Sequence, residues 1–278
     1  MQAIRKTETT DAELLEISVE AAHRGATVIR EATAQRGALV WETKGRSDFV
    51  SEVDKTSEKE IAAVFARRLP DAIVMGEELT PTATWNQGVV VIADPLDGTT
   101  NFLHGYPEYA VSIGVARDGV LRAAVVLNVA RDEEFTATKG GGAFLNGKRI
   151  RVSDLREPGR SLIGTGFPFK HIDKLPQYQE QFSLVMRGTA GIRRAGSAAL
   201  DLCNVACGRF DAFWELDLSP WDIAAGILMV QEAGGIVSDL DGNPPELRPG
   251  GFVAGNPAMH TWLLQTTRRA NMSKRDTG

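Results

Sequence analysis

Val89–Ile92 is an unbroken run of aliphatic side chains with no alternating polar position. This pattern is typical of a strand that is buried on both faces. Asp94, Pro95 and Asp97 follow the run. Because proline has no backbone N–H for a strand ladder, we expect the strand to end there. The pattern therefore predicts two carboxylates at the end of a central buried strand.

Elsewhere the apolar positions recur with helical spacing or alternate as in half-buried strands. The expected helices are Asp11–Arg36, Val53–Leu69, Pro176–Arg187, Gly196–Gly208, Trp221–Ala233 and Pro257–Arg268. The expected strands are Leu39–Thr43, Ala72–Met75, Tyr109–Arg117, Val120–Val129, Glu134–Lys139, Ala143–Arg151, Ser161–Phe167, Gly191–Ala195, Phe210–Leu216, Gly235–Ser238 and Gly251–Ala254. Asp118-Gly119 and Asn146-Gly147 predict hairpin turns. Lys44–Asp48 is expected to be a charged loop.

These elements do not follow a regular βαβ rhythm, and hairpins occupy the middle of the chain. The order favours a mixed, layered α+β fold over a doubly wound sheet. Pro158-Gly159 is the best boundary between two halves, residues 1–157 and 158–278, which can also be counted as one domain.

The chain has 278 residues and a formal net charge of -5. Such a length can bury a large core, and the acidic balance gives no bulk attraction to nucleic acid. Cys203 and Cys207 are one helical turn apart, which is too far for a disulfide, so two free thiols in a reducing cytoplasm are expected. No apolar run is long enough for a membrane span or a signal segment. We therefore expect a cytoplasmic protein without membrane contact.

The residues around Asp94 and Asp97 suit metal-assisted phosphoryl chemistry. Neighbouring carboxylates repel each other unless a cation lies between them, and Mg²⁺ prefers carboxylate and carbonyl oxygens. The amides of Gly98, Thr99 and Thr100 would begin a helix and suit a phosphate. The alternative is structural, because Asp-Pro and Asp-Gly are common turn residues and one aspartate can cap the helix.

Further acids lie at comparable places in the chain. Glu77 and Glu78 follow a short strand, and Asp222 lies at the start of a helix after Pro220 and Trp221. Each has an ordinary explanation by itself, a solvated turn for the glutamates and a helix-dipole contact for Asp222. Together they favour one site, because strand ends and helix N-termini cluster at one edge of many sheets.

With these segments in order, the chain resembles the inositol monophosphatase family. The match extends from about Ala12 to His260 and rests on the string D-P-L-D-G-T-T-N-F at 94–102. The other matching segments are Gly76-Glu77-Glu78, Pro220-Trp221-Asp222 with Ala233-Gly234-Gly235, Lys44 with Asp48-Phe49-Val50 and Val53-Asp54, Gly166-Phe167-Pro168-Phe169, and Gly196-Ser197-Ala198-Ala199. The resemblance implies a layered αβαβα sandwich of the sugar-phosphatase type.

The resemblance also implies a phosphatase that uses two or three Mg²⁺ ions and is sensitive to Li⁺. Its metal ligands would be Glu77, Asp94, the backbone carbonyl of Leu96, Asp97 and Asp222. Glu78 would support these ligands from behind. Lys44 would lie near the metal–phosphate site, or else be a solvated loop lysine.

For the chemistry, the resemblance implies hydrolysis of a phosphate monoester by a metal-activated water, without a covalent enzyme intermediate. Glu77 would help to order the water, and Thr99 with Asp54 would orient and deprotonate it. The amides of Gly98 and Thr99 would hold the phosphate.

The second half of the chain would select the substrate. Glu215 resembles the family acid that accepts hydrogen bonds from ring hydroxyls, although an ordinary strand-end acid is the alternative. The other substrate-binding residues would be Gly196, Ser197, Ala198 and Asp222. Asp217 stands where many relatives have glycine and adds negative charge near the mouth of the site. We expect myo-inositol monophosphate as the substrate. The alternatives are fructose 1,6-bisphosphate, adenosine 3′,5′-bisphosphate, histidinol phosphate and NADP.

Family members are commonly homodimers, and some bacterial relatives act as RNA-polymerase or ribosomal-RNA transcription partners. The residues that could build a basic face for such a role are Lys148, Arg149, Arg151, Arg187, Arg193 and Arg194. Solvated charges are the alternative, because the chain is acidic overall. The histidines show no metal-ligand spacing, and His104 is expected at the surface or in packing.

Overall fold

The computed structural model describes residues 9–34, 41–45, 48–82 and 85–272. The helices are α1 (Asp11–Thr33), α2 (Glu52–Arg68), α3 (Thr99–His104), α4 (Leu175–Gly188), α5 (Ala198–Ala206), α6 (Pro220–Glu232) and α7 (Pro257–Met272), with the 3₁₀ turns η2 (Pro158–Arg160) and η3 (Ile172–Lys174). The strands are β1 (Trp41–Gly45), β2 (Asp48–Ser51), β3 (Ile73–Gly76), β4 (Val89–Asp97), β5 (Ala110–Arg117), β6 (Val120–Asn128), β7 (Glu133–Thr138), β8 (Gly142–Leu145), β9 (Lys148–Arg149), β10 (Leu162–Thr165), β11 (Gly191–Arg193), β12 (Ala212–Leu218), β13 (Ile236–Asp239) and β14 (Gly250–Gly255).

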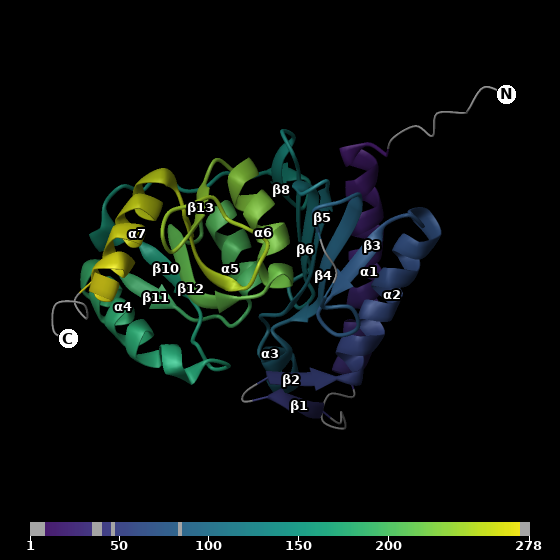
Figure 1. Cartoon of the computed structure of the whole chain (residues 1–278), viewed down its shortest axis with the longest axis horizontal. Helices are drawn as coiled ribbons and strands as arrows, with labels where there is room; N and C mark the ends of the chain where they lie inside the picture. The colour runs from purple at the N-terminus through teal and green to yellow at the C-terminus, as the bar shows by residue number, and fades with distance from the viewer. Residues whose placement is uncertain (1–8, 35–40, 46–47, 83–84, 273–278) are drawn as a thin grey trace.

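Two large sheets alternate with three helical layers, and β1 and β2 form a separate two-stranded sheet (Figure 1). The larger sheet has the order β3-β4-β5-β6-β7-β8-β9, and the smaller has the order β11-β10-β12-β14-β13. Helices α1 and α2 cover the outer face of the larger sheet, α5 and α6 lie between the sheets, and α4 and α7 cover the smaller sheet. Three buried apolar clusters fill the spaces between these layers. The expected α+β class and αβαβα layering are confirmed.

Strand β4 differs from its prediction, because it continues through Pro95 to Asp97. Asp94 is opposite Ser112 of β5 and Asp97 is opposite Ala110, so β4 carries one extra residue in a bulge. The parallel neighbour β3 pairs with β4 only as far as Ala93. Pro95 therefore lies within a bulge and beyond the end of β3, where its missing N–H breaks no ladder bond.

The hairpin predictions are confirmed, with Asp118-Gly119 and Asn146-Gly147 both at positive φ between antiparallel strands. Helix α5 begins two residues later than expected. Gly196 has φ +90°, and Ser197 caps the helix by accepting a hydrogen bond from the N–H of Leu200. The expected charged loop Lys44–Asp48 is shorter, because its two ends belong to β1 and β2, and residues 46–47 lie outside the described residues.

Cys203 and Cys207 are free thiols, as expected. Among the described residues, no helix is both long and apolar enough to cross a membrane. The division into residues 1–157 and 158–278 stays a prediction. Its boundary coincides with η2, and one apolar cluster contains residues from both sides of it.

Candidate active site

Carboxylates from three separate segments are directed to one edge of the larger sheet. Strands β3 and β4 are parallel and end at this edge, where Glu77 follows β3 and its N–H donates to the carbonyl of Ala93 at 3.3 Å. Asp94 and Asp97 lie on either side of the β4 bulge and are 2% and 8% exposed. Asp222 lies in the first turn of α6, which packs against β4 and β5.

One cavity of about 280 Å³ brings these acids together with the beginning of α3. Its lining includes all of the residues expected to bind metal, namely Glu77, Asp94, Leu96, Asp97 and Asp222. Gly98, Thr99 and Thr100 line it as well. In the described part of the chain, no three His, Cys, Asp or Glu side chains are grouped as a ready-made metal cage. The acids therefore surround an open cavity and do not converge on a single point.

Burial and mutual repulsion act on these acids. Burial, followed by the charges of Glu77, Asp97 and Asp222, raises the pKa of Asp94 well above its usual range. Burial raises the pKa of Asp97 to about 6, although hydrogen bonds from the start of α5 oppose this shift. Burial, then Glu77 and Asp97, also raises the pKa of Asp222. Crowded carboxylates in a partly buried cavity fit a hard divalent cation such as Mg²⁺, whose charge would stabilise the ionised forms.

Thr99 and Asp54 meet although 45 residues separate them. Thr99 Oγ1 donates to Asp54 Oδ1 at 2.9 Å and also lies 3.1 Å from the carbonyl oxygen of Leu96. Asp54 lies in the first turn of α2 and is 1% exposed. The hydroxyl of Thr99 is thus held between a buried carboxylate and the bulge of β4, at the wall of the cavity.

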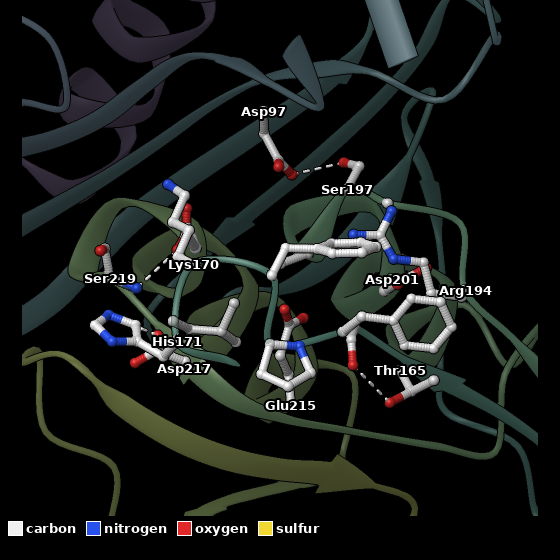
Figure 2. A pocket seen from close by; sticks show the side chains of 18 of the residues that line it. Asp97, Thr165, Lys170, His171, Arg194, Ser197, Asp201, Glu215, Asp217 and Ser219 are labelled. Atoms are coloured by element: carbon white, nitrogen blue, oxygen red, sulfur yellow. Dashed lines mark hydrogen bonds and ion pairs between the residues drawn. The ribbon is translucent and has the colours of Figure 1, made fainter. Parts of the chain in front are cut away.

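The start of α5 holds Asp97 in place. Ser197 Oγ donates to Asp97 Oδ2 at 2.6 Å (Figure 2). The N–H of Ala199 donates to the same oxygen at 2.8 Å. Ser197 also lines a larger neighbouring cavity, but its hydroxyl is committed to this acid. Sequence analysis did not identify Ala199 as a partner of Asp97. The sequence signal for this helix start was Ser197, a typical N-cap residue directly before an apolar helix.

A second cavity of about 370 Å³ adjoins the first and shares Asp97, Arg194, Gly196 and Asp222 with it. Glu215 of β12 lines this second cavity, together with Ser197 and Ala198. Burial, followed by the charge of Asp222, raises the pKa of Glu215 to about 8. The predicted substrate-binding residues of the second half therefore lie together, next to the acids that line the first cavity.

Glu58 is a buried acid that sequence analysis missed. Its carboxylate accepts hydrogen bonds from the N–H groups of Glu78 at 2.7 Å and Leu79 at 3.0 Å. A Cβ at Gly76 would clash with this carboxylate. Glu58 therefore fixes the turn that carries Glu77. The signal was its position four residues after Asp54, which places both acids on one face of α2.

Two further side chains at the second cavity change the expected charge of the site. Asp217 does not simply add negative charge, because it forms an ion pair with Lys174 at 2.7 Å, and its Oδ2 also lies 3.1 Å from His171 Nε2. The guanidinium carbon of Arg194 lies 5.3 and 5.2 Å from the ring centres of Phe167 and Phe169. Arg194 is therefore placed by aromatic contacts at the junction of the two cavities.

Some predicted residues lie elsewhere or outside the described part. The side chain of Lys44 lies outside it, so its role stays a prediction. Glu78 is half-buried, and His104 is exposed at the end of α3. Of the residues proposed for a basic face, Arg194 lines both cavities.

The family is established by comparison with known proteins. The model of the inositol monophosphatase family matches residues 10–272. A Pseudomonas aeruginosa protein named Nus factor SuhB is 46% identical over 257 residues, which are 91% of this chain and 95% of that protein. A Rhizobium meliloti protein named inositol-1-monophosphatase is 40% identical over 261 residues, 94% of this chain and 98% of that protein. The crystal structure of extragenic suppressor protein suhB from Bartonella henselae matches with a TM-score of 0.87 and 40% identity, covering 91% of this chain and 98% of that one.

The matches extend over nearly the whole chain and agree with its layered fold. This chain belongs to the inositol monophosphatase family.

Proposed function

We propose that this protein is a Mg²⁺-dependent phosphatase that hydrolyses a small polyol phosphate, with myo-inositol monophosphate as the preferred substrate. The observation that carries the proposal is the gathering of Glu77, Asp94, Leu96, Asp97 and Asp222 around one cavity. Family membership supports phosphatase activity and metal dependence.

In this proposal the five residues hold two or three ions through carboxylate oxygens and the Leu96 carbonyl. Such cations would neutralise the phosphate oxygens and lower the pKa of the attacking water. Glu77 helps to order that water. Thr99 Oγ1 lies within hydrogen-bond distance of Asp54. If it donates its proton there, it would accept a hydrogen bond from the water, and it would take the proton of the water as it passes its own proton to Asp54.

The phosphate and the polyol would occupy different cavities. The backbone N–H groups of Gly98 and Thr99 would bind phosphate oxygens in the smaller cavity. Glu215 would meet ring hydroxyls in the larger one, lined also by Gly196, Ser197 and Ala198. Asp222, which lines both cavities, would contact both metal and substrate.

The proposal extends to the assembly and the compartment. We propose that the protein is a cytoplasmic homodimer and that each protomer consists of two halves, residues 1–157 and 158–278. Light scattering after size exclusion measures the mass directly, and a monomer at micromolar concentration would contradict the dimer.

The test is phosphate release with Mg²⁺ from myo-inositol 1-phosphate, fructose 1,6-bisphosphate, adenosine 3′,5′-bisphosphate, histidinol phosphate and NADP. We expect the inositol ester to be preferred. Asp94→Asn should lower kcat/KM by about 1,000-fold or more, because it removes a charge from the metal ligands, a loss of about 4 kcal/mol in transition-state stabilisation. Asp118→Asn is the matched control, since Asp118 lies in an exposed hairpin turn.

Wild-type turnover by Asp94→Asn would contradict the metal assignment. A preference for another ester would keep the metal chemistry and overturn the inositol assignment. A second candidate comes from the relatives named Nus factor SuhB. If no ester were hydrolysed, a transcription-partner role without catalysis would become the leading proposal, and capture of RNA polymerase by Asp94→Asn would support it.

A further inference from the structure

Asp201 is a buried acid on the wall of the larger cavity that neither the family motifs nor the proposed mechanism uses. It lies in the first turn of α5 and is 1% exposed. Figure 2 shows it among the residues that line the same cavity as Glu215. Its oxygen Oδ1 is fully buried and has no hydrogen-bond partner in the structure.

A carboxyl group in this position lowers the stability of the fold, so folding by itself does not explain its presence. Buried polar atoms nearly always have a partner, because an unsatisfied one loses its hydrogen bonds to water without replacement. Asp211, a comparable acid 8% exposed and outside this cavity, accepts hydrogen bonds from Ser153 Oγ and from the N–H of Leu162. Asp201 thus differs from Asp211 in that its Oδ1 has no partner, and the residue lines the cavity that a substrate would enter.

The charges around Asp201 indicate which ligand group suits it. Burial, followed by the charges of Glu215 and Asp97, raises its pKa well above the usual range, with Arg194 opposing the shift. A protonated carboxyl offers one O–H donor and one acceptor oxygen. It matches a hydroxyl group, which also donates and accepts, and it does not repel a substrate that already carries a phosphate.

We propose that Asp201 is a further specificity-determining residue, which exchanges hydrogen bonds with a polyol hydroxyl of the substrate from the wall of the larger cavity. The proposal rests on the phosphatase function proposed above and deepens it. Asp201 and Glu215, which both line the larger cavity, would form a pair that recognises hydroxyl groups on the alcohol half of the ester.

The test compares two substrates in three variants. Wild-type protein is first assayed with Mg²⁺ on myo-inositol 1-phosphate and on p-nitrophenyl phosphate, which has no alcohol hydroxyls. Asp201→Leu keeps the side-chain size but has no hydrogen-bonding atoms, and we expect its KM for the inositol ester to rise about tenfold, the effect of about one neutral hydrogen bond. Its kcat/KM for p-nitrophenyl phosphate should change less than about twofold.

Asp201→Asn is the conservative variant. An amide has a donor and an acceptor in the places of the protonated carboxyl, so we expect it to restore recognition of the inositol ester. Asp211→Asn serves as the structural control, since it weakens a buried acid outside the cavity. It should lower Tm while leaving the ratio of the two kcat/KM values unchanged.

The outcomes separate the two proposals. No turnover of either substrate by wild-type protein would be a failure of the proposed phosphatase function. With active wild-type protein, equal losses of Asp201→Leu on both substrates, or no loss on the inositol ester, would overturn the role of Asp201. The role of Asp201 would also be overturned if Asp201→Asn raised the KM for the inositol ester as much as Asp201→Leu does. If Asp201→Leu did not fold, as judged by circular dichroism, Asp201→Ala, which also lacks hydrogen-bonding side-chain atoms, would take its place, and the same outcomes would support or overturn the role of Asp201.

Discussion

At the scale of single residues, the role of an acid is set by its contacts more than by its type. Asp97 is held by two hydrogen bonds from the start of α5, whereas Asp217 is paired with the Lys174 ammonium. Glu58 resembles other polar positions on α2, yet it holds the turn that presents Glu77. Such differences arise from partners far away in the sequence.

The Thr99 hydroxyl provides a prediction at this scale. Thr99→Val removes the group that donates to Asp54 and keeps the side-chain shape. We expect kcat to fall about 100-fold or more, because the water would lose both its orienting group and its route for the proton. Steady-state kinetics on the preferred ester measure the change. Thr99→Ser keeps the hydroxyl and should retain most activity. Full activity of Thr99→Val would remove this pair from the mechanism.

At the scale of elements, the site depends on close packing between helices and strands. Gly114 of β5 lies directly under α6, and a Cβ there would lie 2.8 Å from Ala224 Cβ and 3.0 Å from two backbone atoms of the helix. Backbone atoms cannot rotate away as a side chain can. The absence of a side chain at Gly114 therefore sets how close α6, which carries Asp222, lies to the larger sheet.

Gly114→Ala is the corresponding prediction. The added methyl group should lower the free energy of unfolding by about 1–3 kcal/mol, the usual cost of overpacking a core. It should also reduce activity, because α6 must shift. Urea denaturation measures the stability. Gly159→Ala is the control, since nothing lies within 4 Å of a Cβ there, and it should change stability by less than about 0.5 kcal/mol. Equal stability of the two variants would contradict the packing argument.

At the scale of the whole molecule, the two cavities collect acids whose ionisation opposes folding when no cation is bound. Asp97, with a pKa of about 6, and Glu215, with a pKa of about 8, hold protons in the folded metal-free protein after the unfolded chain has lost them. The folded state therefore binds more protons than the unfolded chain above a pH of about 4. The free energy of unfolding must then fall as the pH rises through 6 and 8.

We accordingly expect the Tm of protein freed of metal by a chelator to decrease by about 5 °C or more between pH 5.5 and pH 8.5, as each kcal/mol shifts Tm by about 2–4 °C. Saturating Mg²⁺ should restore much of this loss at pH 8.5, because it binds the ionised acids of the folded state. Differential scanning calorimetry makes the measurement. A metal-free Tm that rises over this range, or that Mg²⁺ leaves unchanged, would contradict this account.

The sequence by itself determined features that depend on neighbouring residues. The apolar run Val89–Ile92, the hairpin turn Asp118-Gly119 and the helix start at Pro220 follow from local backbone preferences and hydrophobic spacing. The same patterns, with the resemblance to a known family, indicated the fold class and the acids Asp94 and Asp222. The predicted ends of helices were less exact. Gly196 and Ser197, for example, are both plausible residues for the start of a helix, and the local sequence does not decide between them.

Only the tertiary structure decided what depends on residues distant in the chain. It placed Pro95 inside strand β4. Because β3 has already ended and Pro95 lies in a bulge, no ladder hydrogen bond requires a backbone N–H at this position. It paired Asp217, and it buried Asp201 without a partner for Oδ1. Local patterns cannot predict such outcomes, because the burial and charge of a side chain depend on which segments the packed layers bring against it.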